Sequence, residues 1–143
     1  MKKLTLIIGI AAFLLLAFLV SIPIVNDRAA KRTAESIKDI ELPEHTEYVE
    51  TFSEAGKLVG NGNGMQYLGG ILIKSDLLLA DLQAYYGQKD GSCIVEAQSG
   101  KKIRFIEHGE VTLSADIAGD TYFIVYAWGS NDSFFGELDI RGH

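Results

Sequence analysis

An uninterrupted apolar run near the amino terminus constrains this chain more than any other feature. The run covers residues 4–25, contains no charged residue, and has Thr5 and Ser21 as its only polar side chains. As an α-helix its 22 residues would measure about 33 Å, enough to cross a hydrocarbon core of roughly 30 Å. We therefore expect residues 1–26 to form a transmembrane anchor with a short head, in which residues 4–25 contact the lipid bilayer.

Two other interpretations of the run are a cleaved signal peptide and a buried helix of a soluble core. The run exceeds the about 7–15 apolar residues of a signal peptide, and Arg28 occupies the position before Ala29 and Ala30 where cleavage requires a small residue. A buried core helix would need equally apolar partner segments, which the sequence lacks. We favour an uncleaved signal-anchor that crosses the cell membrane once.

The charges beside the run leave its orientation open. By the positive-inside rule they lean slightly toward a cytoplasmic domain, because two lysines precede the run and four basic residues come after it: Arg28, Lys31, Arg32 and Lys38. A three-residue head before a long apolar run instead resembles a signal-anchor, which exports the domain on its carboxyl-terminal side. The Gly-, Thr- and Tyr-rich composition agrees with export. We therefore expect an extracytoplasmic domain and keep a cytoplasmic one as the alternative.

Residues 27–41 are rich in Ala, Arg, Lys and Glu, which favour helix, and Ile37 and Ile40 are their only large apolar residues. We expect a polar helical stalk that lifts the remainder, a small domain over residues 42–143, off the bilayer. Residues 41–143 carry 16 Asp and Glu against 7 Lys and Arg, a net charge of −9. Such a domain repels nucleic acid, so we expect no nucleic-acid partner. The single cysteine, Cys93, excludes an internal disulfide and is expected to be a packed core residue.

The domain's residue patterns predict an α+β fold. Strand-like segments at 44–52 and 65–74 flank the glycine-rich residues 60–64, which is typical of a β-hairpin, and Gly69 and Gly70 indicate a bulge or a close packing contact. A helix is expected over 76–86, with Ser75 as its N-cap and Gly87 as its C-cap. Further strands are expected at 93–97, 103–107, 111–117, 121–128 and 137–141. Residues 121–128 are apolar on both faces, so this strand should be central. The expected architecture is a mostly antiparallel sheet with one helix packed on one face.

The chain carries no recognisable catalytic or cofactor motif. G-x-S-x-G, H-E-x-x-H, C-x-x-C and the P-loop are all absent. Glu107, His108 and Glu110 share one turn and would make a poor metal cage. We therefore expect no catalytic residue, no metal site, no cofactor and no enzymatic activity.

Aromatic residues are the candidates for contact with a ligand or partner. Tyr85, Tyr122 and Trp128 could line a pocket between the 76–86 helix and the sheet. The pair Phe134 and Phe135 belongs either to the core or to an exposed contact patch.

The order of motifs between residues 42 and 87 resembles that of small membrane-anchored bacterial proteins of uncharacterised role. Leu42 and Pro43 precede a Thr-rich strand, a glycine-rich hairpin comes next, and residues 73–77 (IKSDL) open a helix that ends in Tyr85 and Tyr86. The resemblance implies an exported α+β domain and supplies no catalytic residue. We expect a non-enzymatic, envelope-facing module that binds another membrane or envelope protein. The alternative is a small-ligand sensor or carrier that uses the pocket between helix and sheet.

Overall fold

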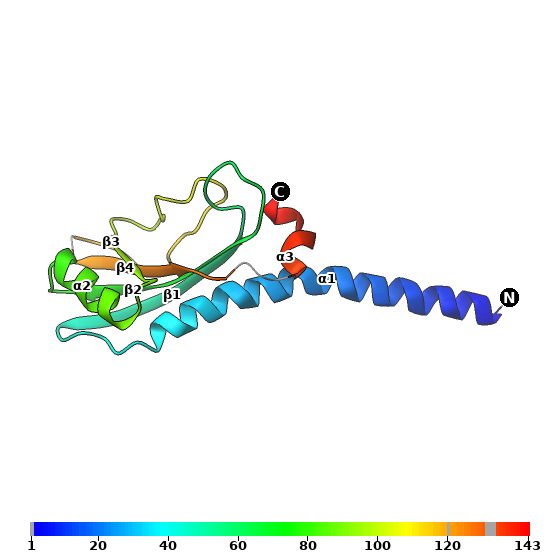
Figure 1. Ribbon diagram of the computed structural model, residues 1–143, viewed down its shortest axis with the longest axis horizontal. Helices are drawn as coiled ribbons and strands as arrows, with labels where there is room; N and C mark the ends of the chain where they lie inside the picture. The colour runs from blue at the N-terminus through cyan, green and yellow to red at the C-terminus, as the bar shows by residue number, and fades with distance from the viewer. Residues whose placement is uncertain (1, 120, 131–133) are drawn as a thin grey trace.

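The computed structural model of the chain describes residues 2–119, 121–130 and 134–143 and has the expected α+β architecture (Figure 1). A long helix, α1 (Lys2–Lys38), is followed by the strands β1 (Thr46–Gly56) and β2 (Gln66–Ser75) and by the helix α2 (Leu79–Lys89). Two strands come next, β3 (Ile94–Ala97) and β4 (Tyr122–Trp128). The chain ends in a short helix, α3 (Phe134–Leu138), and a 3₁₀ turn (Ile140–Gly142).

The four strands form one antiparallel sheet in the order β1-β2-β4-β3. The hairpin predicted around residues 60–64 is confirmed, with Gly56 paired to Gln66 and positive φ angles of 74° at Gly60 and 135° at Gly64. Glycine adopts such angles without steric cost, which explains its abundance in this loop. The central position predicted for 121–128 is also confirmed, because β4 pairs with β2 on one side and β3 on the other.

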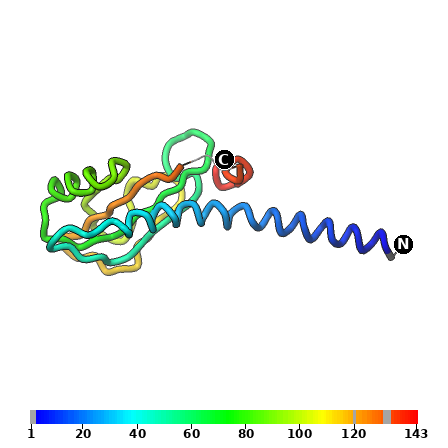
Figure 2. The backbone as a smooth tube through the Cα atoms, turned by 60° about the horizontal axis from the view of Figure 1, so that its bottom comes forward, coloured from blue at the N-terminus to red at the C-terminus, as the bar shows by residue number. Residues whose placement is uncertain are grey.

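Two helices, rather than the expected one, cover one face of the sheet. Their shared core contains Ile37 from α1 and Leu82 and Tyr86 from α2, packed on buried strand residues: Ile71, Ile73, Val95, Phe123, Val125 and Ala127. Figure 2 shows α1 as one continuous helix, whose second half runs alongside the strands and whose first half projects beyond the domain. The additional layer is thus the continuation of the apolar amino-terminal helix.

The opposite face of the sheet is covered by an irregular segment, residues 98–119, and the strands predicted at 103–107 and 111–117 are wrong. Among the described residues of this segment, strand-like pairing is limited to an isolated β-bridge between Lys102 and Thr112. The apolar alternation is nevertheless correct, since Val111 and Leu113 are buried and Thr112 is exposed. Any extended chain lying on a sheet produces that alternation, whether or not its backbone pairs with another strand.

A glutamate side chain replaces a strand ladder in this segment. The Glu50 carboxylate accepts hydrogen bonds from the backbone amides of Ser114 (3.1 Å) and Ala115 (2.8 Å) and from the Ser114 hydroxyl. Burial raises the pKa of Glu50, but these hydrogen bonds outweigh it and hold the pKa below its usual value. Glu50 therefore attaches the irregular segment to β1 in its ionised form.

The predicted ends of α2 are wrong at both termini. The helix starts after Leu78 and runs through Gly87 to Lys89. Ser75 is instead the last residue of β2, where its hydroxyl lies 2.7 Å from that of Thr46 and accepts from the Leu77 amide. Pairing between β1 and β2 therefore keeps Ser75 in the strand, although its local preference is to cap a helix.

The strand predicted at 137–141 is also wrong, because α3 and the 3₁₀ turn occupy this stretch. The Asp139 side chain accepts a hydrogen bond from the Arg141 amide (3.1 Å), which closes the turn locally. The apolar members of the predicted alternation, Leu138 and Ile140, are both exposed, so they do not bury a sheet face.

The predicted stalk is helical, and one of its faces packs into the domain. Buried residues recur along α1 every three to four positions, which places them on one helix face: Ile22, Asn26, Ala30, Ala34 and Ile37. Ala30 and Ala34 pack against Gly69 of β2, where an added Cβ would lie 2.7 Å from the Ala30 carbonyl oxygen. Small residues on both sides thus let the backbones approach closely. Gly69 is a packing contact, whereas the register shift in β1 lies between Tyr48 and Glu50.

Candidate functional site

A buried polar network joins α1 to the end of the chain at the point where the helix leaves the domain. Asn26 is fully buried, and its Nδ2 donates to the Asp139 Oδ2 atom (2.8 Å) and to the Phe135 carbonyl (3.1 Å). The Tyr67 hydroxyl donates to the Asn26 Oδ1 atom (2.9 Å). The amide therefore has partners at both ends, as a buried polar side chain requires.

Arg141 extends this network to the surface of α1. Its guanidinium donates twice to Asp139, from Nη2 to Oδ2 (2.8 Å) and from Nε to Oδ1 (3.0 Å), and Nη1 donates to Asp27 (2.8 Å). Its carbonyl accepts from the Lys57 amide (2.8 Å), and that of Gly142 accepts from the Gly64 amide (2.6 Å). The last residues of the chain thus connect the helix to the hairpin.

The network fixes the charge states of its members. Hydrogen bonds from Arg141 lower the pKa of Asp139 to about 2 against the opposing effect of burial, and Asn26 contributes in the same direction. Burial, followed by the Asp139 charge, raises the pKa of Tyr67. Asp139 is therefore ionised and Tyr67 neutral at physiological pH, which are the states that the hydrogen bonds require.

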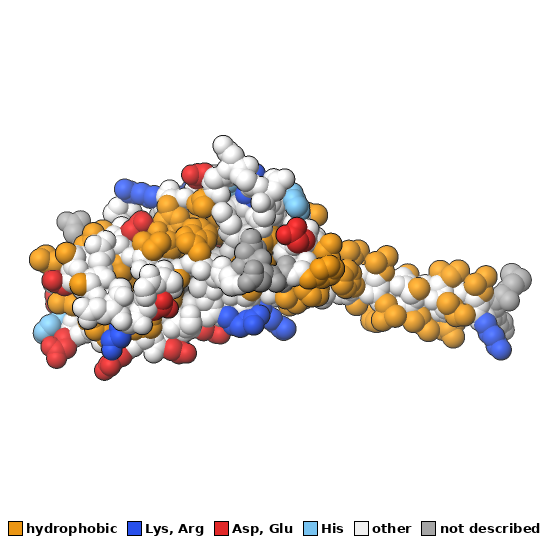
Figure 3. Space-filling model, viewed as in Figure 1, with side chains coloured by type: hydrophobic (Ala, Val, Ile, Leu, Met, Phe, Trp, Pro, Cys, Tyr) orange, Lys and Arg blue, Asp and Glu red, His pale blue; other side chains and the backbone are white. Residues whose placement is uncertain are grey.

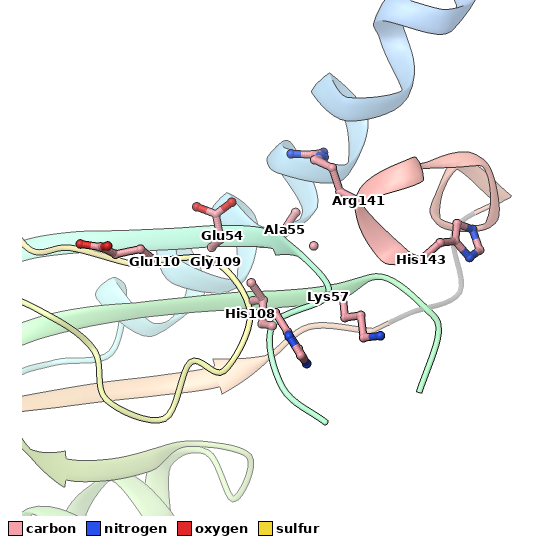
Figure 4. Close-up of a pocket in the computed structure, with 10 residues that line it drawn as sticks. Glu54, Ala55, Lys57, His108, Gly109, Glu110, Arg141 and His143 are labelled. Atoms are coloured by element: carbon pink, nitrogen blue, oxygen red, sulfur yellow. The ribbon is translucent and has the colours of Figure 1, made fainter. Parts of the chain in front are cut away.

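A polar cleft of about 410 Å³ lies between the hairpin end, the turn at residues 108–110 and the carboxyl terminus (Figure 4). Burial, and next the charge of Asp27, raises the pKa of Glu54 at its edge. The His108 Nε2 atom lies 2.8 Å from the Gly60 carbonyl, and Figure 4 shows its ring pointing away from the Glu54 carboxylate. His108 thus supports the hairpin loop, and it does not pair with Glu54 as an acid–base couple would.

The three residues considered for a metal site have separate partners. Glu107 accepts from the Gly60 amide (2.7 Å), and Glu110 pairs with Lys102 (3.1 Å) and Thr112 (2.9 Å). Over the part of the chain that the structure describes, no group of three or more His, Cys, Asp or Glu side chains is placed to hold a metal ion.

Among the described residues, Tyr85 lies on one side of the sheet and Tyr122 and Trp128 lie on the other, so the expectation that all three line a pocket between α2 and the sheet is wrong. Tyr85 lies on α2, where its hydroxyl donates to the Glu41 carbonyl (2.7 Å). Tyr122 packs with the core on the opposite face of the sheet, and the Trp128 ring lies 6.1 Å from that of Phe105 on the same side. Because alternate residues of a strand point to opposite faces, Tyr122 and Trp128 lie on the same face of β4. The helix α2 covers the opposite face of the sheet. Trp128 instead borders a cavity of about 280 Å³ with Val59, Met65, Gln66, Tyr67 and Gly129.

Phe134 and Phe135 lie beside the apolar part of α1. The Phe135 ring is half-buried, with its centroid 6.0 Å from that of Phe18, whereas Phe134 is 68% exposed. Phe135 is thus packed against α1, whereas Phe134 is exposed, so each residue fits a different one of the two alternatives. Figure 3 shows hydrophobic side chains continuing from the projecting helix onto the end of the domain.

Cys93 has the properties of a packing residue. It is half-buried against the core below α2, and burial, followed by the charge of Asp90, raises its pKa to about 11. A thiol with such a pKa is protonated at neutral pH and is a weak nucleophile.

The sequence analysis missed Asn26, Tyr67, Asp139 and Arg141 as a group. The signal that could have found them is the four-residue spacing of Ile22, Asn26, Ala30 and Ala34, which marks one helix face. Because most residues of this face are small or polar, it resembles part of a solvated stalk in the sequence.

Comparisons with known proteins assign neither a family nor a function to the chain, so its function is argued from the geometry of the structure. No family model, no curated protein and no solved structure matches the chain. Among the described residues, one helix, Lys3–Lys38, is long and apolar enough to cross a membrane.

Proposed function

We propose that this chain is a single-pass membrane protein whose domain is a non-enzymatic, envelope-facing interaction module for another membrane or envelope protein. One observation carries the proposal: α1 continues without interruption from the exposed apolar segment into the core of the domain. The domain is therefore held at a fixed distance and rotation relative to the helix axis, whereas a flexible linker would let it sample many positions.

The rigid junction favours a partner at the membrane. A partner that diffuses freely can be bound in any orientation, so binding it requires no fixed geometry. A partner that is itself held in the bilayer or envelope meets the domain at one height, and preorganised presentation reduces the entropy lost on binding. The net charge of −9 over residues 41–143 favours a basic surface on that partner.

The extracytoplasmic placement rests on the Gly-, Thr- and Tyr-rich composition of the domain. The opposite placement has one structural argument, because Arg28, Lys31 and Arg32 are exposed on α1 directly after the apolar segment. Basic residues near the end of a span are typical of the cytoplasmic side. The side of the membrane is therefore the first property to measure.

Labelling of single cysteines in intact cells measures it. In a Cys93→Ser background, Asn61→Cys places a thiol in the exposed hairpin loop, and Lys3→Cys places one on the other side of the span. A membrane-impermeant maleimide should label Asn61→Cys in intact cells and Lys3→Cys only after lysis. The reverse pattern would refute the envelope-facing assignment, and recovery of the protein in the soluble fraction would refute the anchor.

The non-enzymatic part is tested on the full-length protein in detergent. A fragment of residues 41–143 is unsuitable, since it lacks Ala30, Ala34 and Ile37 of the core. Turnover of any substrate that is abolished by Glu54→Gln, at the edge of the polar cleft, would contradict the proposal.

A further inference from the structure

The carboxyl-terminal segment exposes apolar side chains at the base of the domain. Phe134, Leu138 and Ile140 are 68%, 40% and 86% exposed. Beside them, Leu138 and Ile140 join Leu19, Ile22 and Pro23 of α1 around an apolar groove of about 340 Å³. Exposed apolar surface of this kind on a soluble domain needs a partner.

The length of α1 indicates which partner covers this surface. A hydrocarbon core of roughly 30 Å needs about 20 helical residues, so a span that starts at Leu4 reaches Pro23. However, α3 already contacts the helix at Phe18, through Phe135, and at Asn26, through the Phe135 carbonyl. The last turns of the span and α3 therefore lie at the same height, where lipid surrounds the helix.

The charges near α3 fit the boundary between headgroups and acyl chains. Asp139 is buried and is bonded to Arg141 and Asn26, so it places no unpaired charge on the apolar surface. Glu137 is the charged side chain on α3 and is exposed. A carboxylate is costly in hydrocarbon but tolerated among headgroups, which sets the depth of α3 at the interface.

The opposite side of α1 presents basic side chains at a similar height. Arg28, Lys31 and Arg32 are exposed and, at 100° per residue, lie roughly opposite the face that packs on the domain. Basic side chains just above a span attract anionic headgroups. Apolar contact on one side and basic contact on the other thus both favour a lipid surface as the partner.

We propose that Phe134, Leu138 and Ile140 insert into the bilayer interface beside α1 and form a second membrane contact of the domain. This inference rests on the membrane anchor of the proposed function. Two contacts, one on α1 and one on the carboxyl terminus, fix the tilt of the domain as well as its height. The buried network of Asn26, Asp139 and Arg141 holds the second contact in place.

Tryptophan fluorescence of the full-length protein in phosphatidylcholine vesicles tests this contact. Trp128 is the single tryptophan, so a Trp128→Phe background allows one reporter at a time. Phe134→Trp and Ile140→Trp report on the proposed contact. Leu15→Trp reports on the span, and Leu78→Trp, at a residue that is 72% exposed next to α2, reports on the far end of the domain. The quencher is phosphatidylcholine brominated on its acyl chains, close to the headgroup or at the chain ends.

The expected result is strong quenching of Phe134→Trp and Ile140→Trp by bromine close to the headgroup, weaker quenching by bromine at the chain ends, and an unchanged Leu78→Trp signal. If Leu15→Trp is quenched but neither carboxyl-terminal reporter is, the second contact is refuted while the anchor stands. A blue-shifted but unquenched emission at these positions also refutes it, because protein then covers α3. An unquenched Leu15→Trp signal refutes the anchor itself.

Discussion

Two buried tyrosines in this fold should respond in opposite directions to the same substitution. The Tyr67 hydroxyl donates to the Asn26 amide oxygen at 2.9 Å inside the buried network. The Tyr86 hydroxyl, on the buried face of α2, has no hydrogen-bond partner among the described residues. Replacement by phenylalanine removes one oxygen atom from each site and leaves both rings in place.

The expected magnitudes derive from the hydrogen bonds. Tyr67→Phe leaves the Asn26 oxygen buried without a donor, which should cost about 1–3 kcal/mol of unfolding free energy. Tyr86→Phe removes an unpaired polar group, whose burial raises its pKa to about 12, and should stabilise the protein by about 0.5–1 kcal/mol. For a domain of this size each kcal/mol corresponds to about 4 °C in Tm.

Urea and thermal unfolding of the full-length protein in detergent measure both changes. Trp128 is the reporter, because its ring contacts those of Tyr126 and Phe105 in the folded domain. An Asn26→Ala background supplies the control for Tyr67→Phe, since the amide oxygen is then absent and most of the cost should disappear. Equal costs in both backgrounds, or destabilisation by Tyr86→Phe as large as that by Tyr67→Phe, would refute the hydrogen-bond argument.

Two further predictions concern packing and pH. Gly69→Ala places a Cβ 2.7 Å from the Ala30 carbonyl oxygen and should cost about 1–3 kcal/mol by overpacking, whereas Gly87→Ala, within α2 and with no atom near the added Cβ, should stabilise by about 0.5–1 kcal/mol. Equal urea midpoints for these two variants would contradict the close approach of α1 and β2. The pKa of Asp139 falls from 3.8 to about 2 on folding, so its contribution of about 2 kcal/mol is complete above pH 4 and disappears as the pH falls toward 2. Asp139→Asn should flatten the dependence of unfolding free energy on pH over that range, and an unchanged slope would show that the network does not titrate.

The elements that were predicted correctly are those whose structure depends on residues close together in the sequence. The apolar run 4–25, the glycine-rich hairpin and the two-sided apolar pattern of β4 are local, because hydrophobic continuity, positive φ angles and two-face burial are encoded within a few positions. Those three features were enough to establish the α+β class and the helix that is apolar enough to span a membrane.

The errors arose where local preference and tertiary packing disagree. Residues 111–117 have the alternation of a strand, yet the Glu50 side chain supplies hydrogen bonds that a neighbouring strand would otherwise make. Tyr85 and Trp128 are both aromatic and partly exposed, and only the order of layers shows that they lie on opposite faces of the sheet.

The amino-acid sequence by itself determined the apolar helix, the hairpin, the central strand and the acidic charge of the domain. Only the tertiary structure decided that the predicted stalk is part of the core, since Ala30 and Ala34 pack against Gly69, and small residues carry little apolar signal of their own. It also decided the candidate site, because Asn26 and Asp139 are 113 positions apart and become hydrogen-bond partners only when α1 and the end of the chain meet. Side-chain networks between distant segments depend on this mutual placement, which no local pattern records.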